Sequence, residues 1–222
     1  MRQKISPQFS KPGYVAFALI ATACATVFAA INSDGPLPGI GHVPLLPVVV
    51  ISALALLPLV TSIQSRLAKS SDKERTANLA FLCCLGAVLS LPAILIDLVM
   101  PFPQTLNIPL PEALLFYPAI ALVAEVSFHL LPLAVLPTIV ARHPSSPWVF
   151  LPALAAEPLF QFALNTGAAM QGWLVLGNVG LISAVQIWLF LRLGPGAMIA
   201  LRLIYYLLWH VLWGSLRLAL LF

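Results

Sequence analysis

The chain has 222 residues, of which 61% are hydrophobic and only 8% are charged, and its mean hydropathy is +1.01. Ordinary soluble domains carry roughly 25% charged residues, and a soluble domain of this length could not bury so much apolar surface. The composition therefore excludes a soluble protein and indicates a polytopic membrane protein. The net charge of +4 does not indicate nucleic-acid binding, because the basic residues lie mainly in short predicted loops and form no single patch.

Apolar segments long enough to cross a bilayer recur along the chain. A spanning helix needs about 20 mostly apolar residues, and seven segments meet this length: 14–32, 43–64, 77–100, 112–141, 147–166, 170–191 and 196–220. The first is longer than the roughly 7–15 apolar residues of a signal peptide, so we expect an uncleaved span. The sequence predicts one all-α membrane domain, residues 1–222, a bundle of about seven transmembrane helices.

Basic residues mark one side of the predicted membrane domain. Nine of the eleven basic residues precede the first span or lie in alternate loops: Arg2, Lys4, Lys11, Arg66, Lys69, Lys73, Arg75, Arg142 and Arg192. The positive-inside rule assigns this side to the cytoplasm, which predicts a cytoplasmic N-terminus and an external C-terminus. The other two, Arg202 and Arg217, lie within the last span. Arg202 is near enough to the cytoplasmic end to extend toward the surface, or it could bind an anionic group.

Ionisable residues occur at similar depths in three of the predicted spans. At 1.5 Å per residue, Glu125, Glu157 and His210 lie roughly 14–22 Å below the surface from which each span enters. His129 lies one turn from Glu125. A charge at the centre of a spanning helix costs about 2.5–3.5 kcal/mol. Such residues usually mark a functional site, although a polar pair that holds two helices together, worth about 1 kcal/mol, is the simpler alternative.

The neighbours of these residues extend each of them into a row along one helix face. Residues four apart share a face, and three rows have this spacing: Glu125 and His129; Glu157, Gln161 and Asn165; and Tyr206, His210 and Gly214. We expect the rows to face one internal cavity, where Gly214 would allow another backbone or a substrate to come close.

Other polar residues in the spans suggest weaker roles. Asp97 is expected at the membrane interface near the external end of the third span. Asn178, Ser183 and Gln186 are expected to form hydrogen bonds between helices. Three cysteines lie within apolar runs and are interpreted as small packing residues: Cys24, Cys83 and Cys84.

Two carboxyl groups and two imidazoles permit three kinds of chemistry. One is hydrolysis without a metal, in which a carboxylate takes a proton from water and an imidazole stabilises the water or the oxyanion. Another is a zinc or iron site, although the sequence has no HExxH motif. The third is ion-coupled transport through buried carboxyl groups, although no repeat of the kind common in transporters is visible.

Three blocks of the sequence carry these residues: AEVSFH with Glu125 and His129, ALAAEPLF with Glu157, and YYLLWHVLWGSL with His210 and Gly214. They resemble the motifs of the CPBP family (CAAX proteases and bacteriocin-processing enzymes, also called Abi), which are EExxxR, FxxxH and HxxxN or HxxxB. The separations of 32 and 53 residues between Glu125, Glu157 and His210 are similar to the family spacing. The resemblance covers about residues 112–220. Four of six motif positions differ, including Ala124 in place of the first glutamate.

The resemblance implies a metal-independent, glutamic-type intramembrane peptidase without a cofactor, located in a bacterial plasma membrane. Its partners would be membrane lipid and a hydrophobic or prenylated peptide. Glu125 would be the base and His210 the partner of the water or oxyanion, with Glu157 and His129 at altered motif positions. The expected substrate-binding residues are Tyr206, Gly214, Gln161 and Arg202. The altered motifs leave open a related protein that binds peptides or lipids without cleaving them.

Overall fold

The computed structural model describes residues 11–32, 44–67, 78–139, 150–164 and 169–222, and this part of the chain is all-α. The helices, in chain order, are α1 (Lys11–Ile31), α2 (Leu45–Leu67), α3 (Leu79–Val99), a 3-10 turn η1 (Gln104–Leu106), α4 (Ala113–Ala124), a π-helical segment η2 (Glu125–Leu130), α5 (Leu131–Ile139), α6 (Leu151–Leu164), α7 (Ala169–Leu193), α8 (Pro195–Tyr206), a π-helical segment η4 (Leu207–Trp213) and α9 (Gly214–Leu220). Since α4 continues through η2 into α5, and α8 through η4 into α9, these elements form seven helical rods.

Six of the seven rods are long and apolar enough to cross a membrane: Pro12–Ile31, Leu45–Ile63, Leu79–Val99, Ala113–Val135, Met170–Leu193 and Pro195–Leu220. The seventh, α6, is apolar but has only 14 residues, about 21 Å at 1.5 Å per residue. That is shorter than a hydrocarbon core of about 30 Å. The prediction of a polytopic membrane helix bundle is confirmed.

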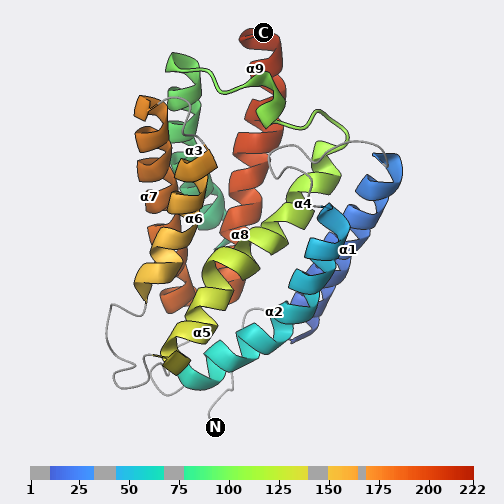
Figure 1. Cartoon of the computed structure of the whole chain (residues 1–222), viewed down its shortest axis with the longest axis vertical. Coiled ribbons are helices and arrows are strands. Elements are labelled where there is room, and N and C mark those ends of the chain that lie inside the picture. The colour runs from blue at the N-terminus through green and yellow to red at the C-terminus, as the bar shows by residue number, and fades with distance from the viewer. Residues whose placement is uncertain (1–10, 33–43, 68–77, 140–149, 165–168) are drawn as a thin grey trace.

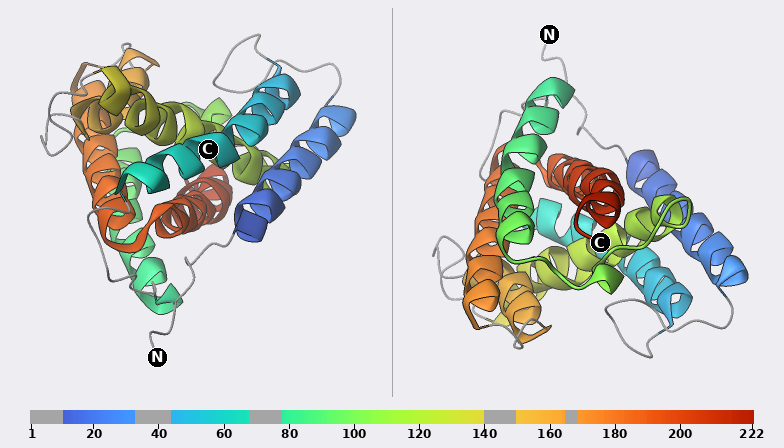
Figure 2. Two further views of the ribbon diagram at one scale, coloured as in Figure 1. Left: turned by 90° about the horizontal axis from the view of Figure 1, so that it is seen from below. Right: turned by 90° about the horizontal axis from the view of Figure 1, so that it is seen from above.

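The last rod runs through the middle of the bundle. Helix α8 packs against α3, α4 and α7, while α1 packs against α2 and α4, and α6 packs against α7. Figure 1 shows α8 and α9 between the α3, α6 and α7 group on one side and α1, α2 and α4 on the other. The connection from α3 to α4 crosses the bundle beside α9, as the view from above in Figure 2 shows. Side chains on α8 and η4 therefore meet residues from several other helices.

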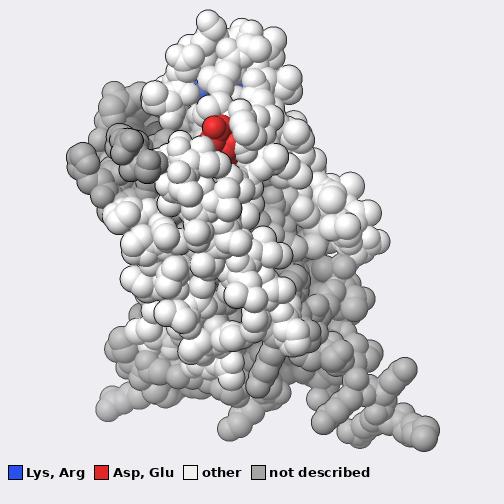
Figure 3. Space-filling view, turned by 90° about the vertical axis from the view of Figure 1, so that its right-hand side faces the viewer, with Lys and Arg blue, Asp and Glu red and all other residues white. Residues whose placement is uncertain are grey.

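The outer face of the bundle is apolar. Large hydrophobic side chains are exposed on several helices; Leu19, Leu54 and Leu95, for example, are 65%, 73% and 60% exposed. The described part of the face in Figure 3 shows almost no charged side chains. Cys83 and Cys84 are exposed on this outer face. The interpretation of these two cysteines as packing residues is therefore wrong.

Two π-helical segments interrupt otherwise regular helices, and they contain three of the predicted site residues. Glu125 and His129 lie in η2, and His210 lies in η4. A π-helical turn adds one residue to the hydrogen-bonded loop and so redirects the side chains around it, and such turns occur frequently at functional sites. The local backbone thus distinguishes these positions from the rest of the spans.

Candidate functional site

A single buried guanidinium binds both of the predicted carboxylates. Arg202 on α8 is only 3% exposed. Its Nε donates to Oε1 of Glu125 at 2.5 Å. Its Nη1 and Nη2 donate to Oε1 and Oε2 of Glu157 at 2.7 and 2.5 Å, which is a bidentate pair. The predicted meeting of Glu125 and Glu157 therefore occurs through Arg202, which does not extend to the membrane surface.

Three further side chains complete this cluster around Arg202. Gln186 of α7 donates to Glu125 Oε1 and accepts from Arg202 Nη2 at 3.0 Å. The hydroxyl of Tyr206 accepts from Arg202 Nη1 at 3.1 Å. His129 Nδ1 lies 3.4 Å from Arg202 Nη2 and 3.5 Å from Glu125 Oε2. We refer to these six residues, Glu125, His129, Glu157, Gln186, Arg202 and Tyr206, as the Arg202 cluster.

The spacing of residues along the last span indicates the central place of Arg202, although its depth in the membrane alone does not. Arg202 precedes Tyr206 by four residues, and Tyr206 precedes His210 by four, so Arg202 extends the predicted row by one more step. Gln186 was expected to bond between helices, and it does so, joining α7 to η2 and α8. Arg202 is thus the centre of the predicted cluster.

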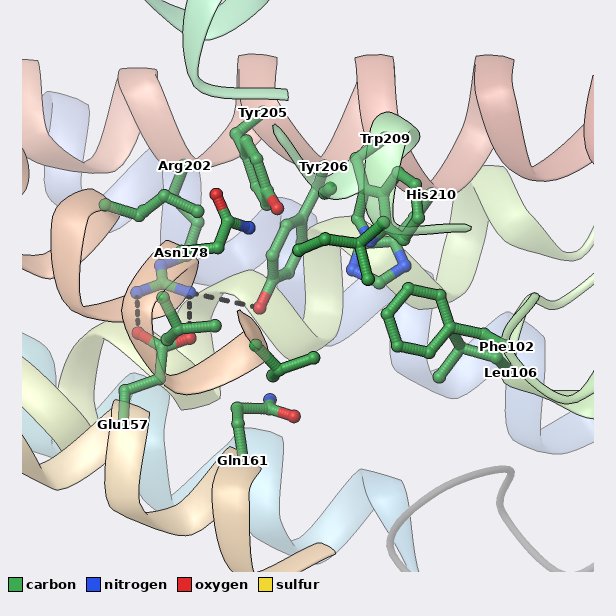
Figure 4. A pocket seen from close by; sticks show the side chains of 15 residues that line it. Phe102, Leu106, Glu157, Gln161, Asn178, Arg202, Tyr205, Tyr206, Trp209 and His210 are labelled. Atoms are coloured by element: carbon green, nitrogen blue, oxygen red, sulfur yellow. Dashed lines mark hydrogen bonds and ion pairs between the residues drawn. The ribbon is translucent and has the colours of Figure 1, made fainter. Parts of the chain in front are cut away.

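A cavity of about 90 Å³ lies next to the Arg202 cluster. Its polar lining comes from three helical rods and includes Glu157, Gln161, Asn178, Arg202, Tyr205, Tyr206 and His210. Figure 4 shows Glu157 bound directly to Arg202 at one end of it, and Gln161 on the opposite side from Tyr206 and His210. Since one water needs about 10–15 Å³ of such space, the cavity has room for several water molecules.

The predicted rows contribute unequally to this cavity. The row on α6 supplies Glu157 and Gln161, and the row on α8 and η4 supplies Tyr206 and His210. Glu125 and His129 are not among the lining residues, and both are fully buried on the other side of Arg202. The expectation that all three rows face the cavity is therefore wrong for the Glu125 row. Asn165 lies outside the described residues.

His210 is held by residues that the sequence did not single out. The ring of Tyr117 on α4 stacks on it, with centroids 4.6 Å apart and planes at 18°. Asn107, from the connection between α3 and α4, donates to its carbonyl oxygen at 3.2 Å. The close neighbour of Gly214 is also Asn107, since a Cβ at position 214 would lie 2.7 Å from its Nδ2. Nothing in the local sequence around Asn107 indicates this contact.

A second buried ion pair lies near the other end of the last rod. Asp97 and Arg217 are both 0% exposed. Arg217 Nε donates to Asp97 Oδ2 at 2.6 Å, and Nη2 donates to Oδ1 at 2.9 Å. The indole of Trp213 also donates to Oδ2, at 2.7 Å. Asp97 was expected at the membrane interface, but it lies inside the bundle because Arg217 neutralises its charge there.

The residues described by the structure contain no group of three or more His, Cys, Asp and Glu side chains arranged to hold a metal ion. In the Arg202 cluster, the guanidinium occupies the place between the carboxylates where a cation would otherwise bind.

The fold and the site define a class: a helical integral membrane protein with a buried ion-pair cluster beside a small polar cavity. No family model, no curated protein and no solved structure matches the chain. The geometry of the site is therefore the basis for any assignment of function.

Proposed function

We propose that this protein is an intramembrane hydrolase resembling the CPBP peptidases, which cleaves a peptide bond in a hydrophobic or lipid-linked peptide. The observation that carries the proposal is that Glu157 and His210, from two different rods, line one cavity large enough for water. A carboxylate and an imidazole around a held water molecule are the groups that metal-independent hydrolysis requires.

In the proposed reaction, Glu157 accepts a proton from water as the water oxygen attacks the peptide carbonyl carbon. Each carboxylate oxygen has about two acceptor sites, and each oxygen of Glu157 has one bond from Arg202, so an acceptor site remains for water. His210 and the Tyr206 hydroxyl are placed to stabilise the oxyanion. The proton then passes from Glu157 to the amide nitrogen as the C–N bond breaks.

This proposal changes the role given to Glu125. Because Glu125 does not line the cavity but binds Arg202 Nε, it acts as a positioning residue that holds the guanidinium. Arg202 in turn orients the Glu157 carboxylate through two hydrogen bonds. The cavity of about 90 Å³ is smaller than the roughly 300–1,000 Å³ of typical ligand pockets, so it would hold only the reacting part of the peptide.

A second candidate function is a binding protein on the same scaffold, without catalysis. Two observations favour it: Arg202 engages both oxygens of Glu157, and four of six motif positions differ from the CPBP pattern. Such a protein would bind the polar part of a peptide or lipid in the cavity and release it unchanged.

The two candidates are distinguished by reconstituting the full chain in liposomes with a panel of hydrophobic and prenylated peptides, and reading cleavage by mass spectrometry. We expect cleavage that is lost in Glu157→Gln and in His210→Ala. The matched control is Ser183→Ala, a buried change on α7 at a residue that does not itself line the cavity, which should retain activity. Unchanged turnover in Glu157→Gln would contradict the proposal. Absence of cleavage, with saturable binding that Glu157→Ala removes, would establish the binding protein instead.

A further inference from the structure

The connection between α3 and α4, residues 100–112, forms one wall of the cavity. Phe102 and Leu106 from this connection line it, and Figure 4 shows both side chains beside His210. Asn107 follows them directly and is only 5% exposed. A buried amide at this position must find partners for its polar atoms, and those partners identify what Asn107 does.

The hydrogen bonds of Asn107 determine which end of its amide is which. Oδ1 accepts from Arg217 Nη1 at 3.3 Å, and Nδ2 donates to the carbonyl oxygen of His210 at 3.2 Å. An arginine side chain can only donate and a carbonyl oxygen can only accept. The reversed orientation would therefore place two donors together at one end and two acceptors at the other.

This orientation has a consequence for the imidazole of His210. Asn107 Nδ2 lies 3.5 Å from His210 Nδ1. Because the amide nitrogen can only donate, this contact is a hydrogen bond only when the facing ring nitrogen accepts, and it therefore favours the neutral imidazole whose proton is on Nε2. The Tyr117 ring, stacked on the imidazole, holds the plane in which this proton lies.

Gly214 provides the space that Asn107 occupies. A Cβ at position 214 would approach Nδ2, Cγ and Cβ of Asn107 to 2.7, 3.0 and 3.2 Å. The first two atoms belong to the amide itself, so any larger residue at 214 displaces the group that faces His210. Glycine is therefore required at 214 for this contact.

The amide is also anchored from the opposite side. Arg217 donates to the carbonyl oxygens of Phe102 and Pro103 as well as to Asn107. Asp97 accepts from the backbone nitrogen of Phe102 at 2.9 Å, and Tyr117 accepts from that of Ile108 at 3.2 Å. The connection is thus attached on both sides of Asn107, which keeps the amide in place.

From these contacts we infer that Asn107 is a positioning residue for His210, holding its imidazole as the tautomer with the proton on Nε2. The catalytic importance of this role rests on the proposed function, since it supplies a donor of fixed direction for the oxyanion. The tautomer itself is a property of the folded protein and is measurable without any substrate.

The test is nitrogen-15 NMR of the full chain, labelled in its histidine rings, with the His210 signals identified from their loss in His210→Ala. In the wild type we expect Nε2 protonated and Nδ1 unprotonated. Asn107→Asp replaces the donor by an acceptor and should move the proton to Nδ1, while Asn107→Ala should give a mixture. Gly214→Ala, which displaces the amide, should resemble Asn107→Ala. The control is Gln104→Ala, an exposed change on the same connection, which should leave the spectrum unchanged.

Activity gives a second readout. Asn107→Ala should lower kcat roughly 10- to 100-fold, with a smaller effect on KM, because misplacing a catalytic group affects the transition state more than substrate binding. A wild-type ring with the proton on Nδ1, or a tautomer unaltered in both Asn107→Ala and Asn107→Asp, would overturn the inference whether or not the protein cleaves peptides. The expected tautomers in a protein that cleaves no peptide would support the role of Asn107 and refute the proposed function alone.

Discussion

Replacing Arg202 with methionine removes the one guanidinium that binds both Glu125 and Glu157 while keeping a long apolar side chain. Two unit charges about 4 Å apart attract by about 4 kcal/mol at an effective dielectric constant of about 20. The two carboxylates together therefore lose about 8 kcal/mol of attraction. The cost of burying the guanidinium offsets part of this loss. Removing one partner of a buried ion pair typically costs about 3–5 kcal/mol, and we expect Arg202→Met to lower the free energy of unfolding by that amount.

A companion variant separates charge from packing. Glu125→Gln and Glu157→Gln, added to Arg202→Met, remove the uncompensated charges as well, so most of the lost stability should return. The control is Arg192→Met, the same change at an exposed position of α7, which should alter stability by no more than about 0.5 kcal/mol. Unfolding of the purified protein by denaturant in mild detergent measures all three. A loss below about 1 kcal/mol in Arg202→Met, or a triple variant as unstable as the single one, would refute the reasoning.

Three further predictions can be tested on the same protein. Arg217→Met should lower the free energy of unfolding by about 3–5 kcal/mol because Asp97 is left buried without a counter-charge, and Asp97→Asn in the same chain should recover much of it in the same assay. Gly86→Ala places a Cβ 2.6 Å from Ile204 Cγ2 and should lower the free energy of unfolding by about 1–3 kcal/mol. Adding Ile204→Ala should remove the clash, so the double variant should lose less than the sum of the two single losses. A loss equal to that sum would contradict this. The distribution of basic residues predicts that reporter fusions will place the N-terminus in the cytoplasm and the C-terminus outside, which requires the 14-residue helix α6 to cross together with the six longer spans; both ends on one side would show that the number of crossings is even.

The helices of this protein could be predicted because the bilayer constrains their length and composition. The apolar segment at 77–100 corresponds to Leu79–Val99, and the segment at 170–191 corresponds to Ala169–Leu193. In lipid every backbone polar group must be bonded within the helix, so an apolar run of this length has few alternatives. The π-helical segments at Glu125–Leu130 and Leu207–Trp213 were not predicted, since hydropathy carries no information about the hydrogen-bond pattern.

The candidate site could be predicted only in part, because depth in the membrane does not determine which way a helix face points. Depth correctly placed Glu125 and Glu157 in one layer, and they share Arg202. Depth could not show that Glu157 lines the cavity, whereas Glu125 binds Arg202 without lining it. Asn107 was missed because it reaches His210 across 103 positions of sequence, and only the packing of the α3–α4 connection against η4 brings them together.

The two ion-pair clusters of the last rod differ in their balance of charge. Arg202 and Arg217 are 15 residues apart, about 22 Å along a helix. Arg217 faces the single carboxylate of Asp97, so the charges of that pair cancel.

The Arg202 cluster is not balanced in the same way. It has two carboxylates for one guanidinium, and its charges cancel only when a proton resides on His129 or on one carboxyl group. Within the described residues, Glu125 Oε2 and His129 Nε2 also have no hydrogen-bond partner, although buried polar atoms are normally paired. This unbalanced cluster lies beside the cavity. In the proposed reaction, Glu157 takes up a proton there and later releases it.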